Sequence, residues 1–274
     1  MFKTLQDQAA GLRRLMATPK PRVMSILSAS ANTQASQLVS NLAATISAQD
    51  NKVLIIEASE HAQELTHFVD HLPALLDVAN GQSLLMNAIM DTDLGFYCAK
   101  LKHVFQQETT LDTFENQQLG FIFEELMHQF DVVLVNAALD QQDLLPLSVL
   151  NESEILIQLS REPASIKHAY GLIKRICSQI GNRSFSIVVD NATEEQAEAI
   201  FNNIAEVAWR FMKIQLSFFG AIPNDEHLLR AAHLGRSVVE AFPMATASTA
   251  FHKIAEKMHK KPKRVTKKHS PSTI

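Results

Sequence analysis

The chain has 274 residues, of which 46% are apolar and 20% are charged. This composition is typical of a globular protein and excludes a largely disordered chain. No run of about 18 apolar residues occurs, and the first residues include acidic and amide side chains where a signal peptide needs an apolar segment. We therefore expect a cytoplasmic protein.

Charge is distributed unevenly between the body of the chain and its C-terminal end. Residues 253–274 carry eight Lys or Arg and one Glu, which leaves the rest of the chain with a net charge of −11. An acidic body argues against specific binding of nucleic acid. The basic tail, residues 260–274, is interpreted as a solvated segment, with electrostatic contact to phosphates or anionic lipid as the alternative.

The first 16 residues predict a separate amphipathic helix. Apolar side chains recur at spacings of three and four, which places them on one helical face: Phe2, Leu5, Ala9, Leu12 and Met16. Residues 17–22 contain two prolines and predict a linker, because proline cannot continue a helix. A detached helix with an apolar face is expected to bind a partner surface.

Short apolar runs alternate with helical patterns through residues 23–259. The predicted strands are 23–27, 53–57, 94–99, 132–136, 155–159, 185–189 and 216–222. The predicted helices are 34–48, 83–89, 111–129, 164–180, 194–211, 226–234 and 246–258. Several runs are continuously apolar, as strands covered on both faces are. The alternation predicts one α/β domain, with helices flanking a single doubly wound, mainly parallel sheet.

The first predicted strand leads through SASANTQAS, residues 28–36, into a helix. A nucleotide-binding α/β protein keeps its phosphate loop at this place. Such a loop needs glycines, which let backbone N–H groups approach the phosphates, and a lysine, which neutralises their charge. Residues 28–36 contain neither residue type. The position of this segment between a strand and a helix therefore predicts a phosphate loop, whereas its amino-acid types do not.

Four segments resemble the MinD/ParA family of deviant P-loop ATPases, and in particular its FlhG/FleN branch of flagellar-number regulators. They are DQAAGLRRL (7–15), LLDVANGQSLLMNAIMDTDLG (75–95), EPASIKHAYGLIKRI (162–176) and FGAIPNDEHLLRAAHLGRSVVEAFPMATASTAFHKIAEKM (219–258). Together they are spread over nearly the whole chain. The resemblance implies a P-loop NTPase, MinD-like fold for residues 23–259.

The resemblance also implies a partner for residues 1–16. In the FlhG/FleN branch, an N-terminal helix with a motif like DQAAGLRRL (7–15) docks on FlhF, a signal-recognition-type GTPase, and activates it. Gln8 would offer a polar group to the catalytic site of the partner, while Asp7 and Arg13 would fix the register. The apolar stripe of Phe2, Leu5, Ala9 and Leu12 would be buried. Flagellar basal-body or regulatory proteins are further implied partners, with recruitment to the cell pole or inner membrane.

Aligned on Asn41, Leu42 and Ala43, the family motif KGGxGK[ST] falls on residues 30–36. Ser30 then replaces the deviant signature lysine, and Ala35 replaces the main phosphate lysine. Asn32 and Gln34 stand at glycine positions. Only Ser36 keeps its family type, a hydroxyl for magnesium.

Other family positions are substituted as well. Glu57 and Ser59 stand at the two ends of the Asp-x-Asp that orients the attacking water, and Asn136 replaces the metal-linked aspartate. Asp190 occupies the position at which the family has an asparagine on the adenine side of the nucleotide. Phosphoryl transfer depends on positioning and charge, so these substitutions predict a degenerate site, no catalytic residues and a pseudo-ATPase without a cofactor. Weak binding of Mg-ATP at the helix N-terminus stays an alternative.

Two further features have alternative interpretations. His67 and His71 are one helical turn apart, but no third ligand accompanies them, so no metal site is predicted. Helix 246–258 carries Phe251, Ile254 and Met258 on one face with Lys257 nearby, and it resembles the basic amphipathic membrane anchor of MinD-type proteins. Packing of this face against the body of the protein is the competing interpretation.

The leading interpretation is an FlhG/FleN-like regulator of flagellar placement or number that stimulates an FlhF-like GTPase. One alternative is a residual MinD-type ATPase switch, with ATP-dependent dimerisation and membrane binding. Another is an interaction scaffold outside motility.

Overall fold

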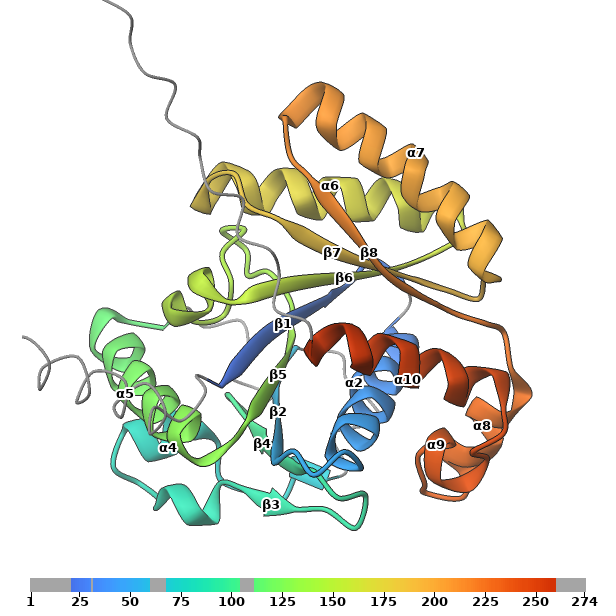
Figure 1. Cartoon of the computed structure of the whole chain (residues 1–274). Helices are drawn as coiled ribbons and strands as arrows, with labels where there is room; N and C mark the ends of the chain where they lie inside the picture. Colours follow the sequence, from blue (N-terminus) through green and yellow to red (C-terminus); the bar gives the residue numbers. More distant parts are fainter. Residues whose placement is uncertain (1–20, 31, 60–67, 104–110, 260–274) are drawn as a thin grey trace, which may run out of the picture.

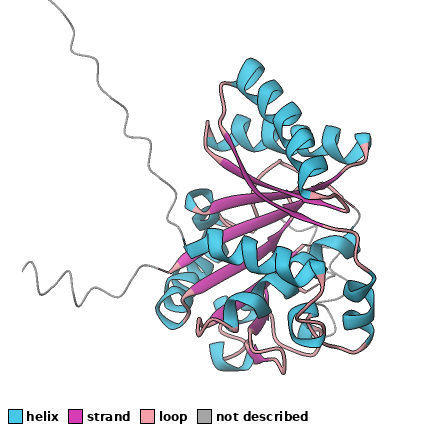
Figure 2. Ribbon diagram, turned by 45° about the vertical axis from the view of Figure 1, so that its right-hand side comes forward, coloured by secondary structure: helices cyan, strands magenta, loops and turns pink. Residues whose placement is uncertain are grey.

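An eight-stranded sheet with the order β3-β4-β2-β5-β1-β6-β7-β8 forms the centre of the protein, and helices cover both of its faces (Figures 1 and 2). The computed structural model describes residues 21–30, 32–59, 68–103 and 111–259, with the backbone alone at 32–35 and 259. The predicted N-terminal helix 1–16, most of the linker and the basic tail lie outside the described residues. The limits of these three segments therefore stay predictions.

The strands are β1 (Arg22–Ser28), β2 (Val53–Ala58), β3 (Met90–Asp91), β4 (Tyr97–Lys100), β5 (Val132–Ala137), β6 (Glu154–Ser160), β7 (Phe185–Asp190) and β8 (Leu216–Ile222). Each neighbouring pair is parallel except β3 with β4, which is antiparallel. All seven predicted strands are present, and the doubly wound, mainly parallel sheet is confirmed. The predicted strand 94–99 begins later than expected, at Tyr97.

The helices form two layers, each with its own apolar cluster. The cluster on one face includes side chains of α4 (Leu75–Ala79), α5 (Thr113–Gln129), α6 (Pro163–Ile180) and α7 (Glu194–Met212). The cluster on the other face includes side chains of α2 (Asn32–Ser47), α8 (Glu226–His233), α9 (Val238–Ala241) and α10 (Thr246–His259). Short 3₁₀ turns occur at η1 (Leu85–Asn87) and η3 (Ser148–Glu152). The predicted helix 83–89 is wrong, because the chain makes only the η1 turn before Met90 pairs with Cys98.

The apolar face of α10 is buried against β8 and α2. Phe251 and Ile254 are each 1% exposed, and Met258 is 5% exposed. A Cβ atom on Gly220 of β8 would lie only 2.6 Å from Cγ1 of Ile254, so the glycine permits this close packing. The membrane-contact interpretation of this face is therefore corrected, because the body of the protein covers it.

The fourth residue of that prediction, Lys257, also turns towards the sheet. Its Nζ donates to the carbonyl oxygen of Phe218 at 3.3 Å and lies 5.1 Å from the centroid of the Phe218 ring. The ammonium group thus binds the edge strand β8.

Candidate functional site

The candidate site lies where the parallel strands end at their carboxyl termini. In doubly wound sheets, ligands bind outside these ends, at the point where the chain connections diverge to opposite sides. Here β1 lies between β5 and β6, so the crevice opens beyond Ser28. Glu57, Asn136 and Asp190 are buried polar residues at the carboxyl ends of β2, β5 and β7 along this edge.

Glu57 and Asn136 bind each other across β2 and β5. The two residues are register partners, and Nδ2 of Asn136 donates to Oε2 of Glu57 at 2.8 Å. The other carboxylate oxygen of Glu57 accepts the backbone N–H of Ser59 at 2.9 Å and its hydroxyl at 2.8 Å. The structure therefore brings together three of the predicted site residues, in a network made within the protein.

Burial determines the ionisation of Glu57. Removal from water raises the pKa of this carboxyl to about 7, although the hydrogen bonds from Asn136 and Ser59 act in the opposite direction. The carboxyl therefore holds a proton at a higher pH than an exposed glutamate does. An aspartate in contact with water would carry a full negative charge near neutral pH.

The end of β1 is tied to the start of α6. Oγ of Ser28 accepts the N–H of Ser30 at 3.1 Å, and Oγ of Ser30 lies 3.2 Å from Oγ of Ser165. Ser30, which the alignment places at the position of the signature lysine, thus contacts Ser165 of the same chain. Asn32, Gln34 and Ala35 lie in the first turn of α2, where the structure describes only the backbone.

Among the described residues of this region, Ser36 has a hydroxyl whose hydrogen-bonding capacity is not satisfied. It is fully buried, and its Oγ has no hydrogen-bond partner among the described residues. A buried hydroxyl without a partner is uncommon, because its desolvation costs free energy.

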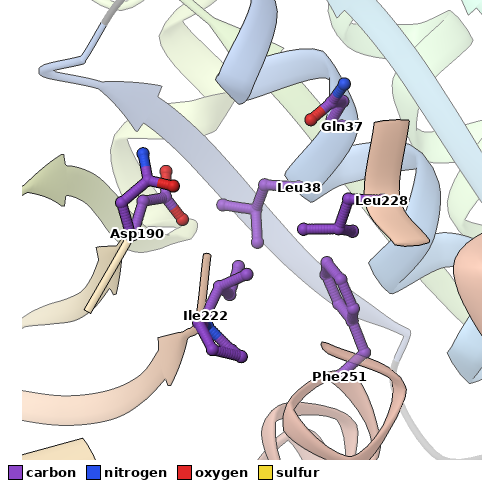
Figure 3. Close-up of a pocket in the computed structure, with 8 residues that line it drawn as sticks. Gln37, Leu38, Asp190, Ile222, Leu228 and Phe251 are labelled. Atoms are coloured by element: carbon purple, nitrogen blue, oxygen red, sulfur yellow. The ribbon is translucent and has the colours of Figure 1, made fainter. Parts of the chain in front are cut away.

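The predicted adenine side contains a buried polar pair and only a small cavity. Nε2 of Gln158 donates to Asp190, and burial raises the pKa of that carboxyl to about 7. A cavity of about 50 Å³ remains there, and Figure 3 shows Asp190, Leu38, Ile222 and Phe251 around it. Sites for drug-sized ligands measure roughly 300–1,000 Å³, so this cavity is small.

A second cavity, of about 200 Å³, lies beside the Glu57 network. Ser28, Ser59 and Asn136 line it on the sheet side, and His168 and Arg175 line it from α6. The guanidinium of Arg175 is 3.0 Å from a carboxylate oxygen of Asp143, so its charge is paired.

Sequence reasoning missed two parts of this region. Gln158 was not singled out, although a glutamine within the apolar run EILIQLS of β6 is a sign of a buried polar contact. The position of Phe251 in the wall of the adenine-side cavity was also missed, since it depends on where α10 packs.

Several predictions cannot be placed in the structure. The predicted partner-binding residues Phe2, Leu5, Asp7, Gln8, Ala9, Leu12 and Arg13 lie outside the described residues, as does His67. Within the described ranges, no helix is long and apolar enough to cross a membrane.

No family model matches this chain, but its sequence is similar to those of known proteins. The antiactivator FleN of Pseudomonas aeruginosa is 27% identical over 221 residues, which cover 80% of this chain and 79% of FleN. An uncharacterized ATP-binding protein of Methanocaldococcus jannaschii is 21% identical over 251 residues, which cover 89% of each protein.

Solved structures agree in fold. The MinD cell division protein of Aquifex aeolicus aligns with a TM-score of 0.63 at 19% identity, covering 87% of this chain and 96% of that one. A ParA family ATPase of Chlorobium tepidum aligns with a TM-score of 0.67 at 20% identity, covering 86% of this chain and 98% of that one. The chain therefore has the fold of these MinD/ParA proteins, and its sequence is similar to that of FleN, in agreement with the resemblance to the FlhG/FleN branch.

Proposed function

We propose that this protein is an FlhG/FleN-like regulator of flagellar placement or number whose own ATPase site is inactive. The observation that carries the proposal is the hydrogen bond between Asn136 and Glu57. In the family, these two strand ends carry carboxylates that serve magnesium and the attacking water. Here the side-chain amide of Asn136 donates a hydrogen bond to the carboxyl of Glu57, whose pKa is raised by burial.

The remaining residues of the crevice also do not fit ATP hydrolysis. Phosphoryl transfer requires fixed positive charge around the phosphates and carboxylates around the metal. The segment from Ser28 to Ser36 has no lysine or arginine, and an amide at position 136 adds no negative charge to a magnesium shell. The small adenine-side cavity leaves little room for a base.

In this proposal the N-terminal segment performs the regulatory work. Residues 1–16 bind an FlhF-like GTPase, Gln8 contacts its catalytic site, and Asp7 and Arg13 fix the register. The name of the P. aeruginosa relative, an antiactivator, supports a regulatory role. Recruitment to the cell pole or inner membrane and contact with basal-body proteins belong to the same proposal.

The proposal is tested by measuring two activities separately. A peptide of residues 1–20, and the full protein, should stimulate GTP hydrolysis by an FlhF-like partner, and Gln8→Ala should weaken both effects. The full protein itself should release no phosphate from Mg-ATP. An unchanged GTPase rate with peptide and protein alike would reject the regulatory part, and ATP turnover would reject the inactive site.

One observation favours the alternative of a residual ATP-binding switch. The buried hydroxyl of Ser36 has no partner among the described residues, and it stands at the family position for a magnesium ligand. Titration calorimetry with Mg-ATP separates the two functions. Binding tighter than about 100 μM, or about 5.5 kcal/mol, that is lost in Ser36→Ala would support the switch, and the absence of heat would exclude it.

A further inference from the structure

We propose that the outer face of α5 binds residues 1–16 of this same chain. Phe114 is 59% exposed and Phe121 is 64% exposed. The two rings are seven residues apart, which places them on one side of the helix. Leu119, Phe123 and Leu126 are buried on its opposite side. The outer face therefore offers an aromatic stripe that the described residues leave open to solvent.

The apolar pattern of residues 1–16 matches this stripe in period. Phe2, Ala9 and Met16 recur every seven residues, and Leu5 and Leu12 form the second series between them. The spacing between successive apolar residues thus alternates between three and four. This spacing is typical of the apolar face along which one helix packs against another. Leu5 and Leu12 have the same separation along the chain as Phe114 and Phe121. One alignment of the two helices therefore allows Leu5 to contact Phe114 and Leu12 to contact Phe121.

Charge is complementary between the two segments. Helix α5 contains Glu115, Glu124 and Glu125 but no Lys or Arg, which gives it a net charge of −3. Residues 1–20 contain four Lys or Arg and only one acidic residue, Asp7, which gives a net charge of +3. Opposite charges beside an apolar seam favour this pairing and its orientation.

The N-terminal segment also enters the fold beside α5. The N–H of Arg22 donates to the carbonyl oxygen of Asp131 at 2.9 Å, and Asp131 directly follows Phe130, the C-cap of α5. Residues 17–21 can span at most about 17 Å when extended, and a helix with its side chains is about 10–12 Å across. The connection is therefore long enough to pass around the end of α5.

The lengths of the two helices are matched as well. A helix of residues 1–16 would measure about 24 Å, and the 17 residues of α5 measure about 26 Å. Since the chain enters at the C-terminal end of α5, the docked helix would run in the same direction as α5. Residue 16, which adjoins the linker, would then lie near the C-terminal end of α5.

Docking has a consequence that rests on the proposed function. The face containing Leu5 and Leu12 would contact α5 in the free protein and the GTPase in the complex. The two surfaces would therefore compete for the same segment. In this arrangement α5 holds the activating element away from other partners until the GTPase displaces it.

The docking itself is tested by trypsin cleavage of the full chain after Arg13 and Arg14, followed by mass spectrometry. If the docked state is populated at about 90%, cleavage is slowed about tenfold, because it proceeds through the open state. The double variant Phe114→Ser/Phe121→Ser should therefore raise the cleavage rate about tenfold. Both residues are exposed, so the fold should tolerate the change.

Controls separate docking from general effects. Phe211→Ser, which removes a ring that is 69% exposed on α7, should leave the rate unchanged. Glu124→Lys/Glu125→Lys should raise the rate as the double serine variant does. A wild-type rate that depends on protein concentration would mean that a second copy supplies the segment, and equal rates in all variants would overturn the proposal. No GTPase enters this measurement, so its outcome is independent of the test of the proposed function.

Discussion

Replacing Asn136 by aspartate would restore the residue type that the family keeps at the end of this strand. In this protein, however, the new carboxylate would face Glu57 instead of a metal. Nδ2 of Asn136 now donates to Oε2 of Glu57 at 2.8 Å, and both residues are buried. The substitution converts a donor–acceptor contact into a contact between two acceptors.

The cost depends on pH. Loss of a hydrogen bond to a charged group removes roughly 1.5–3 kcal/mol. Two carboxylates about 3 Å apart repel by up to about 5 kcal/mol at an effective dielectric constant of 20, and uptake of a proton relieves much of this repulsion. We therefore expect Asn136→Asp to lower the free energy of unfolding by about 3 kcal/mol at pH 8 and by less than about 1 kcal/mol at pH 5, where the pair shares a proton.

Urea unfolding followed by circular dichroism at the two pH values measures these differences, provided that the slope with denaturant is unchanged. The double variant Glu57→Gln/Asn136→Asp is the matched control. It reverses the polarity of the hydrogen bond, since the introduced amide can donate to the introduced carboxylate, and should recover most of the stability at pH 8.

Mg-ATP provides the functional comparison. If the crevice were still a magnesium site, the restored carboxylate would bind the metal, and the nucleotide would stabilise Asn136→Asp. We expect no such stabilisation, because the lysine positions remain Ser30 and Ala35. Equal stability of Asn136→Asp and the wild type at pH 8, or its rescue by Mg-ATP, would refute the reasoning.

Two further predictions concern stability. The pKa values of Glu57 and Asp190 are raised to about 7 from 4.5 and 3.8, so the folded chain holds protons that the unfolded chain releases between these limits. Stability should therefore fall as pH rises from about 4 to 7, by at most about 3–4 kcal/mol for each carboxyl, and Glu57→Gln or Asp190→Asn should flatten this slope in urea unfolding. Gly220→Ala should cost about 1–3 kcal/mol, because its Cβ would meet Cγ1 of Ile254 at 2.6 Å. Gly171→Ala, in an uncrowded position of α6, should instead gain up to about 1 kcal/mol; a thermal melt that ranks the two glycine variants equally would contradict this explanation.

The sequence predicted the strands of the sheet well because most of them are covered on both faces. Their apolar runs are then continuous and short, which distinguishes them from the longer amphipathic helices. The elements it missed among the described residues are β3, α4, α9 and η3, which are only two to five residues long. Such elements are held by contacts with distant residues, as in the pairing of Met90 with Cys98, and carry little periodicity of their own.

The face of α10 shows a different limit of sequence reasoning. Its apolar side chains fit a membrane surface or a protein core equally well. The deciding residue is Gly220, which lies in another segment and lets α10 approach β8. Likewise, the motif alignment identified Glu57 and Asn136 as substitutions, but their contact depends on β2 lying beside β5, 79 positions along the chain.

If the ATPase site is inactive as proposed, these contacts explain how a nucleotide-binding fold can persist without its ligand contacts. Polar groups at the ends of buried strands must be hydrogen-bonded, and in the absence of phosphate and metal they need protein partners. Glu57 with Asn136, and Gln158 with Asp190, provide such partners on the two sides of β1. Under the proposed function, a crevice stabilised in this way would gain less from a nucleotide, and nucleotide binding would be a weak means of changing the shape of the protein. The proposed control by displacement of the N-terminal segment from α5 would require no nucleotide, and it would act on the segment that is proposed to bind the partner.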